Sequence, residues 1–172
     1  MVLLTVDNCV HSAVDVQKVH PYRLDAFSSG DTGPLGFVEE NAVRLTRNWP
    51  VALVYIAQIA SKNIASVKYW PRVEIVMNHA GASGARVDAL LAQAAARHDD
   101  PVRGIVVAAT GNGTVHHDLE AALLRAQAAG IAVVLATRCA LGRVLPVERS
   151  LFADSKGLSP VKARIALMLS LL

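Results

Sequence analysis

The chain has 172 residues, a length that suits one ordinary domain or one domain with part of another. Apolar residues make up 53% of the sequence and charged residues 18%, a composition too apolar for a disordered chain. The net charge of +3 is spread along the chain without a basic run, so no nucleic-acid partner is expected.

The first 45 residues predict short strands separated by turns. Residues Leu3–Val6 read as a strand, and the polar stretch Asp7–Lys18 reads as either a hairpin or a loop. The Gly-Pro pair within Thr32–Val38 indicates a turn that enters another strand. Because no segment here has enough periodic apolar sequence for a core of its own, we interpret residues 1–45 as the remnant of a domain whose beginning is absent.

The segment 46–71 differs in composition from its neighbours. It contains two Trp-Pro pairs, and its centre, Val51–Ala60, is uncharged. That run has about half the length of a membrane-spanning helix, so we expect no membrane partner and read the segment as an atypical apolar linker. The amino terminus lacks the basic region of a signal peptide, which leaves the localisation unknown and cytoplasmic by default, with the native amino terminus expected to lie outside this sequence.

Residues 72–172 predict alternating strands and helices. The apolar runs expected to form strands are Val73–Met77, Gly104–Ala108 and Ala132–Ala136. The expected helices run from an N-cap at Ser83 to about Arg97, from Val115 to Ala129 before Gly130, and onwards from Ser159-Pro160. This alternation predicts an α/β fold whose parallel sheet is covered by helices on both faces. Such sheets bind ligands beyond the carboxyl ends of their strands, here in the loops Asn78–Ser83, Thr110–Thr114 and Thr137–Gly142.

One glycine-containing motif lies at that edge. The segment Gly111-Asn112-Gly113-Thr114 falls between a predicted buried strand and a helix start, where backbone amides can hold a carboxylate or a phosphate. It lacks the third glycine of a dinucleotide fingerprint and the lysine of a phosphate-binding P-loop. Taken alone, the motif is more often a tight strand-to-helix turn than a ligand site.

The histidines and cysteines do not suggest a metal centre. His116 and His117 are adjacent, so on a helix their rings would point about 100° apart and could not chelate one ion together. No carboxylate stands at ligand spacing, and Cys9 and Cys139 match neither a metal motif nor a disulfide framework. His79 reads as a polar loop residue, and we expect neither a metal nor a cofactor.

Five segments, in chain order, resemble the L-asparaginase/glutaminase family of threonine-nucleophile amidohydrolases. Together they span nearly the whole chain except residues 46–71. They are Asp15-Val16-Gln17-Lys18, Leu24-Asp25-Ala26-Phe27, Gly33-Pro34-Leu35-Gly36-Phe37, Gly104-Ile105-Val106 leading into Gly111-Asn112-Gly113-Thr114, and Ser159-Pro160-Val161-Lys162-Ala163-Arg164.

The resemblance implies a fold and a reaction. Residues 72–172 would form the family's carboxy-terminal α/β domain, with a parallel sheet of about four strands, after a partial amino-terminal domain in residues 1–45. Family active sites lie between the first domain of one subunit and the second domain of a neighbour, which implies a homo-oligomer or a partner that supplies an amino-terminal half. The implied substrate is L-asparagine or L-glutamine, hydrolysed at its side-chain amide without a cofactor.

The resemblance also implies three site residues. Lys18 matches the catalytic lysine that pairs with an aspartate and a second threonine to transfer a proton. Thr114 matches the polar position that contacts the neighbouring subunit's substrate. Glu148 matches the glutamate that meets the α-amino group of that substrate, across a loop shorter than is usual in the family.

The family's two nucleophile motifs, Thr-Gly-Gly-Thr-Ile and His-Gly-Thr-Asp-Thr, do not occur in this sequence. A proton-relay partner without the nucleophile does not hydrolyse amides. The sequence therefore predicts an asparaginase-family fragment that is inactive alone. The alternative is a non-catalytic remnant, or an α/β module for oligomerisation or small-ligand binding.

Overall fold

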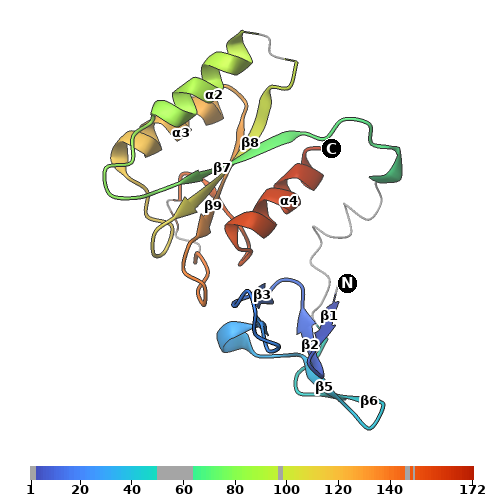
Figure 1. Ribbon diagram of the computed structural model, residues 1–172. Helices are drawn as coiled ribbons and strands as arrows, with labels where there is room; N and C mark the ends of the chain where they lie inside the picture. Colours follow the sequence, from blue (N-terminus) through green and yellow to red (C-terminus); the bar gives the residue numbers. More distant parts are fainter. Residues whose placement is uncertain (1–2, 50–63, 97–98, 146–147, 149) are drawn as a thin grey trace. The chain divides into compact units, whose positions relative to one another are not determined.

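The computed structural model describes residues 3–49, 64–96, 99–145, 148 and 150–172 (Figure 1). The chain divides into two compact units, unit 1 (Met1–Lys62) and unit 2 (Asn63–Leu172). The predicted apolar run Val51–Ala60, and with it most of the predicted linker 46–71, lies outside the described residues. No helix in the described part of the chain is long and apolar enough to span a membrane.

Unit 1 is built from short antiparallel strands. A four-stranded sheet has the order β1-β2-β5-β6, and β3 pairs with β4 in a separate two-stranded ribbon. The bounds are β1 Leu3–Val6, β2 Cys9–Ser12, β3 Gln17–Lys18, β4 Phe27–Ser28, β5 Gly36–Glu39 and β6 Ala42–Leu45, with a 3-10 turn at Gly30–Thr32. The hairpin alternative for the start of Asp7–Lys18 is confirmed, because Asp7 and Asn8 have φ of 49° and 56°, as a tight two-residue hairpin turn requires.

The interior of unit 1 is small and partly polar. Among the described residues of this unit, the buried apolar side chains are Val10, Ala26 and Leu35. His11 and Ser29 are also buried, and His11 Nδ1 lies 2.9 Å from Ser29 Oγ. Burial lowers the pKa of His11 below its ordinary value, since the charged imidazolium loses water. A hydrogen-bonded polar pair thus shares the interior with few apolar side chains.

Unit 2 is a parallel α/β sandwich, which confirms the predicted fold class. Its four-stranded sheet has the order β10-β9-β8-β7, and every neighbouring pair is parallel. The strands are β7 Arg72–Met77, β8 Val102–Ala109, β9 Ala132–Thr137 and β10 Ala153–Asp154; the helices are α2 Ala85–Ala95, α3 His117–Ala128 and α4 Pro160–Ser170, and a 3-10 turn spans Ile64–Ser66. In Figure 1, α2 and α3 cover one face of the sheet and α4 covers the other.

The central strand β8 shows why its sequence has no polar side chain from Gly104 to Ala109. Ile105 and Val107 pack in the cluster beneath α2 and α3, whereas Val106 packs against α4. Side chains along a strand alternate between faces, so a strand covered on both sides is apolar throughout. On the α4 side, Ala163 and Leu167 complete the smaller cluster. Unit 2 therefore has a core on both faces of its sheet.

Two details of unit 2 differ from the expectation. The N-cap of α2 is Gly84 rather than Ser83, and no side chain caps this helix. A Cβ atom at Gly84 would lie 2.6 Å from Ala122 Cβ, so the glycine lets α2 approach α3 closely. The sheet has the expected four strands, but the sequence did not indicate where the fourth strand, β10, lies, because its two residues are too few to show a pattern. By contrast, Ser159 and Pro160 begin α4 as predicted.

Candidate functional site at the carboxyl edge of the sheet

The loops after β7 and β8 meet at the carboxyl edge of the sheet through Asn78. This residue is 4% exposed and follows the last residue of β7. Its Nδ2 donates to Thr110 Oγ1 at 3.2 Å and to the Thr114 carbonyl oxygen at 3.1 Å. Its Oδ1 accepts from the His116 backbone N–H at 2.8 Å. One buried amide thus holds both ends of the turn after β8 and the start of α3.

The turn itself is closed by its own backbone. The Thr114 N–H donates to the Thr110 carbonyl oxygen at 2.8 Å, and the Thr110 N–H donates to the Thr114 carbonyl oxygen at 3.2 Å. Gly111 and Gly113 have φ of 49° and 86°, in the left-handed region that favours glycine. Because the Thr114 amide is used inside the turn, an anion would have to be held by other groups. The turn therefore fixes the backbone of the exposed Thr114 rather than offering that amide to a ligand.

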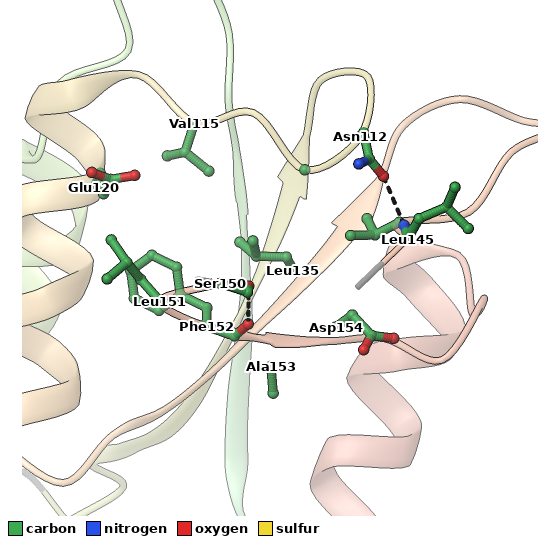
Figure 2. A pocket seen from close by; sticks show the side chains of 12 residues that line it. Asn112, Val115, Glu120, Leu135, Leu145, Ser150, Leu151, Phe152, Ala153 and Asp154 are labelled. Carbon is green, nitrogen blue, oxygen red and sulfur yellow. Dashed lines mark hydrogen bonds between the residues drawn. The ribbon is translucent and has the colours of Figure 1, made fainter. Parts of the chain in front are cut away.

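A cavity of about 260 Å³ lies beside this turn (Figure 2). Its polar groups include the carboxylates of Glu120 and Asp154, which lie on opposite sides of the cavity in Figure 2. Neither Thr114 nor Glu148 lines this cavity. The lining residues are Asn112, Gly113, Val115, Glu120, Leu135, Val144, Leu145, Ser150, Leu151, Phe152, Ala153 and Asp154.

Three of the polar groups of this cavity are already engaged in structural hydrogen bonds. Asn112 Oδ1 accepts from the Leu145 N–H at 2.7 Å, and Ser150 Oγ donates to the Phe152 carbonyl at 2.7 Å. Asp154 Oδ1 accepts from the Lys156 N–H at 2.7 Å. With its two carboxylates apart and these groups engaged, the described residues that line the cavity form no paired acid and base.

A second, more open hollow joins two of the predicted edge loops. Thr110 and Gly111 come from the loop after β8, and Arg138 and Cys139 come from the loop after β9. The Arg138 N–H donates to the Ala109 carbonyl at 2.9 Å, which keeps the two loops together. The loops that sequence reasoning placed at the ligand-binding edge therefore do adjoin one another.

The three predicted site residues fall in different units. Lys18 lies in unit 1, on the short strand β3, where it is exposed and its Nζ lies 5.9 Å from the centroid of the Phe27 ring. Thr114 and Glu148 lie in unit 2 and both are exposed, Thr114 at the end of the turn and Glu148 in the loop before β10.

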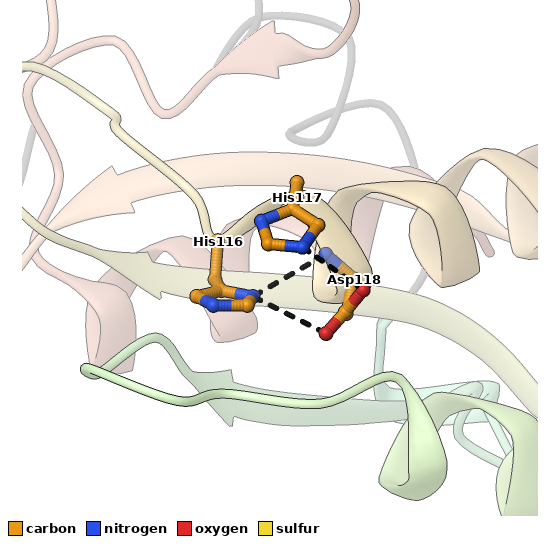
Figure 3. A group of neighbouring side chains, drawn as sticks. All are labelled: His116, His117 and Asp118. Carbon is orange, nitrogen blue, oxygen red and sulfur yellow. Dashed lines mark hydrogen bonds and ion pairs between the residues drawn. The ribbon is translucent and has the colours of Figure 1, made fainter.

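The start of α3 departs from the sequence-based expectation. His116 is the N-cap of the helix, with an extended backbone (φ −62°, ψ 140°), so it does not follow the helical 100° step. Its ring stacks on that of His117, with centroids 4.3 Å apart and an interplanar angle of 27° (Figure 3). The expectation that the two rings point apart was wrong, as was the expectation that no carboxylate stands at ligand spacing: Asp118 Oδ1 is 3.2 Å from His117 Nε2.

Asn78 is the residue that sequence reasoning missed. The sequence placed it in an edge loop, but its partners lie 32 to 38 residues further along the chain. No local pattern signals such a contact. The available hint was an asparagine directly after a buried strand, where an amide side chain can satisfy backbone groups of the next loop.

Known proteins match this chain over both units. The family described as "Glutaminase/Asparaginase C-terminal domain" matches residues 72–172, and the family described as "Asparaginase, N-terminal" matches residues 1–51. The solved structure of a probable cytoplasmic L-asparaginase from Campylobacter jejuni superposes with a TM-score of 0.81 and 29% identity, and the match covers 98% of this chain and 52% of that one.

Three curated relatives show similar identities. L-asparaginase 2 of Escherichia coli (strain K12) is 29% identical over 175 residues, which cover 99% of this chain and 47% of the relative. Glutaminase-asparaginase of Pseudomonas fluorescens biotype A is 29% identical over 99% of this chain and 46% of the relative. One subunit of the glutamyl-tRNA(Gln) amidotransferase of Metallosphaera sedula is 32% identical over 78% of this chain and 28% of the relative. This chain thus spans about half the length of the first two relatives.

Proposed function

We propose that this chain, which belongs to the glutaminase/asparaginase family, supplies the catalytic lysine, Lys18, and the second domain of an amidohydrolase. The reaction is the conversion of L-asparagine and water to L-aspartate and ammonia. The observation that carries the proposal is the turn ending at Thr114, which Asn78 and the backbone hold at the carboxyl edge of a parallel sheet. In this proposal, residues 1–45 end the first domain, 46–71 link the domains and 72–172 form the second domain.

The chemistry requires the hydroxyl of a threonine nucleophile, and neither of the family's two nucleophile motifs occurs in this sequence. An amino-terminal half, supplied by the same protein or by a partner, contributes it. The hydroxyl oxygen attacks the side-chain amide carbon, the C–N bond breaks, and ammonia leaves with the proton it receives. Water then hydrolyses the acyl-enzyme and regenerates the threonine.

Lys18 is the proposed catalytic residue of this chain. Its ammonium is exposed above the Phe27 ring, and among the described residues no carboxylate forms an ion pair with it. The amino-terminal half would bring an aspartate and a second threonine to this ammonium, and the group would then transfer the proton of the nucleophile. Charge coupling and burial are what make a lysine suitable for that role.

Thr114 and Glu148 are the proposed substrate-binding residues. The hydroxyl of Thr114 is short, so it can contact a substrate reproducibly only if its backbone is fixed, and the turn provides that fixation. Glu148 offers an exposed carboxylate that would pair with the substrate's α-ammonium group. Both would act on the substrate of a neighbouring subunit, which implies a homo-oligomer.

Complementation tests this function. The full chain is mixed with the part of an L-asparaginase relative that precedes the matched region, and ammonia release is measured with L-asparagine and with L-glutamine. Neither half alone should release ammonia, whereas the mixture should. Lys18→Met should lower the rate by about 100-fold or more, as expected for loss of a proton-transfer group. Lys68→Met, at another exposed lysine, is the matched control and should leave the rate unchanged.

Full activity of the isolated chain would overturn the need for a second half. Equal rates for Lys18→Met and the unsubstituted chain would remove Lys18 from the mechanism. Absence of ammonia release from every mixture would favour a second candidate, a non-catalytic module for oligomerisation or small-ligand binding.

The observation that favours this second candidate is the core of unit 2 on both faces of its sheet. This candidate predicts that the chain is an oligomer in size-exclusion chromatography and that it unfolds cooperatively in a thermal melt. It also predicts that inorganic phosphate or L-aspartate raises the melting temperature without turnover. Rapid aggregation of the full chain without a ligand effect would contradict it.

A further inference from the structure

A cluster of three potential metal ligands lies at the start of α3, outside the edge turn and both hollows. His116 Nδ1 lies 3.8 Å from Asp118 Oδ2, and His117 Nε2 lies 3.2 Å from the other oxygen of the same carboxylate, Oδ1 (Figure 3). The three ligand atoms all lie within 4.8 Å of one another. We propose that His116, His117 and Asp118 form a surface site for a divalent transition-metal ion of the Zn²⁺ class.

The spacing of the ligand atoms suits such an ion. Zn²⁺ binds histidine nitrogen and carboxylate oxygen at about 2.0–2.2 Å, so two ligands of a tetrahedral ion lie about 3.3–3.5 Å apart. The 3.2 Å between His117 Nε2 and Asp118 Oδ1 is close to that value, whereas His116 Nδ1 lies 3.8 Å from the other carboxylate oxygen, Oδ2. The remaining adjustment falls on the side chains, of which His117 is 83% exposed.

The backbone already places one ligand. The His116 N–H donates to the buried Asn78 amide at 2.8 Å, and the extended conformation of this N-cap brings its ring against that of His117. The nitrogen Nδ1 now accepts a long hydrogen bond of 3.3 Å from the Asp118 N–H. A metal ion at Nδ1 would take the place of this hydrogen bond, so the His116 ring would turn away from the Asp118 N–H while Asn78 still holds the His116 backbone.

The donor set selects the class of ion. Two imidazoles and one carboxylate suit Zn²⁺, Cu²⁺, Ni²⁺ or Co²⁺, whereas Mg²⁺ and Ca²⁺ prefer oxygen ligands alone. The positive end of the α3 dipole opposes any cation here, and the Asp118 carboxylate offsets that opposition. With three protein ligands, the ion would keep at least one position for water. The site does not depend on the proposed amide hydrolysis, since it uses none of Lys18, Thr114 and Glu148.

The test is a titration of the untagged full chain with Zn²⁺ by calorimetry, repeated with Co²⁺ by visible absorption. All proteins carry Cys139→Ser, because the exposed Cys139 thiol is itself a soft metal ligand. We expect one ion per chain, displaced by excess Ni²⁺ and unaffected by excess Mg²⁺. His117→Ala and Asp118→Asn should each weaken binding by about tenfold or more, because each removes one ligand from the ion.

His79→Ala is the matched control, since His79 is an exposed histidine in the loop after β7, outside the cluster. It should leave both the affinity and the cobalt spectrum unchanged. Thermal melts of each variant without metal would confirm that the fold is intact, which the exposure of His117 favours. The proposal would be overturned if His117→Ala and Asp118→Asn bound the ion as tightly as the chain without these substitutions. Loss of the ion in His79→Ala would overturn it too.

Discussion

The side-chain amide of Asn78 donates a 3.1 Å hydrogen bond to the carbonyl oxygen of Thr114, across 36 residues of sequence. The same buried side chain also contacts Thr110 and His116, so it joins the loop after the edge strand β7 to the turn after the central strand β8. The position proposed to contact substrate is therefore tied to the sheet through one amide.

Replacement of Asn78 by Ala should destabilise unit 2 clearly. The change removes three hydrogen bonds and leaves the His116 N–H and the Thr114 carbonyl without that partner, for a loss of about 2–3 kcal/mol in the free energy of unfolding. Urea unfolding followed by circular dichroism measures it. Asn112→Ala is the control, because Asn112 is exposed and makes one such contact, and it should cost about 1 kcal/mol or less. Similar losses in both variants would contradict the role assigned to Asn78.

The contact between α2 and α3 should respond to substitutions at Gly84 and Ala122 as a pair. Gly84→Ala places its new methyl group 2.6 Å from Ala122 Cβ, and such overpacking costs about 1–3 kcal/mol. Ala122→Gly alone costs about 1 kcal/mol in helix propensity. The double variant should be more stable than the sum of the two losses predicts, because the shortest contact is removed and a 3.1 Å approach to the Asp118 carbonyl oxygen remains.

A double-mutant cycle of urea midpoints checks this coupling. Gly142→Ala is the control, since the nearest atom to a Cβ there is 3.7 Å away, and it should change stability little. Strict additivity of Gly84→Ala and Ala122→Gly would show that the helices adjust without strain.

His11 should make unit 1 sensitive to mild acid. Burial lowers its pKa in the folded state below the ordinary 6.5, so the unfolded chain binds the proton more readily. The neutral histidine therefore contributes stability that is fully present above pH 6.5 and is lost as the pH falls through the lowered folded-state pKa.

Thermal melts between pH 7.5 and pH 5 measure this dependence, with the fluorescence or NMR signals of unit 1 as the probe. His11→Gln should flatten the dependence, because glutamine does not titrate in this range. His79→Gln, at an exposed histidine, should leave it unchanged. A steep dependence that survives in His11→Gln would assign the acid sensitivity to another group.

Arg164 should protect the edge strand β7 of the sheet that the described residues form. Its Nε donates to the Val73 carbonyl oxygen at 2.7 Å, from α4 to the edge strand β7. Arg164→Met keeps most of the apolar stem but loses this bond, which should cost about 1 kcal/mol. It should also increase aggregation measured by light scattering, because an uncovered edge pairs with other strands. Arg86→Met, at an exposed arginine on α2, is the control and should behave like the unsubstituted chain.

The elements that sequence reasoning predicted are those with a local signal. The three longer strands of unit 2 are apolar runs, and the helix before Gly130 ends where that glycine takes a φ of 84°. The contacts it missed depend on tertiary structure. The N-cap at Gly84 is set by the approach of α3, and the stacking of His116 on His117 is set by a backbone bond to Asn78. Helix α3 is far from Gly84 in the sequence, and Asn78 is far from His116, so no pattern of spacing predicts either contact.

The place of β8 between two parallel neighbours determines how unit 2 will open. Its amides bond to flanking strands, and Ile105, Val106 and Val107 are fully enclosed by helices on both sides. Local fraying of an edge strand or a helix end leaves these amides protected, so their hydrogens exchange with solvent deuterium only when the whole unit opens. The exchange rate at these three positions is thus a direct gauge of the global stability of unit 2, and a change at the Thr114 turn registers there only if it weakens the entire sheet.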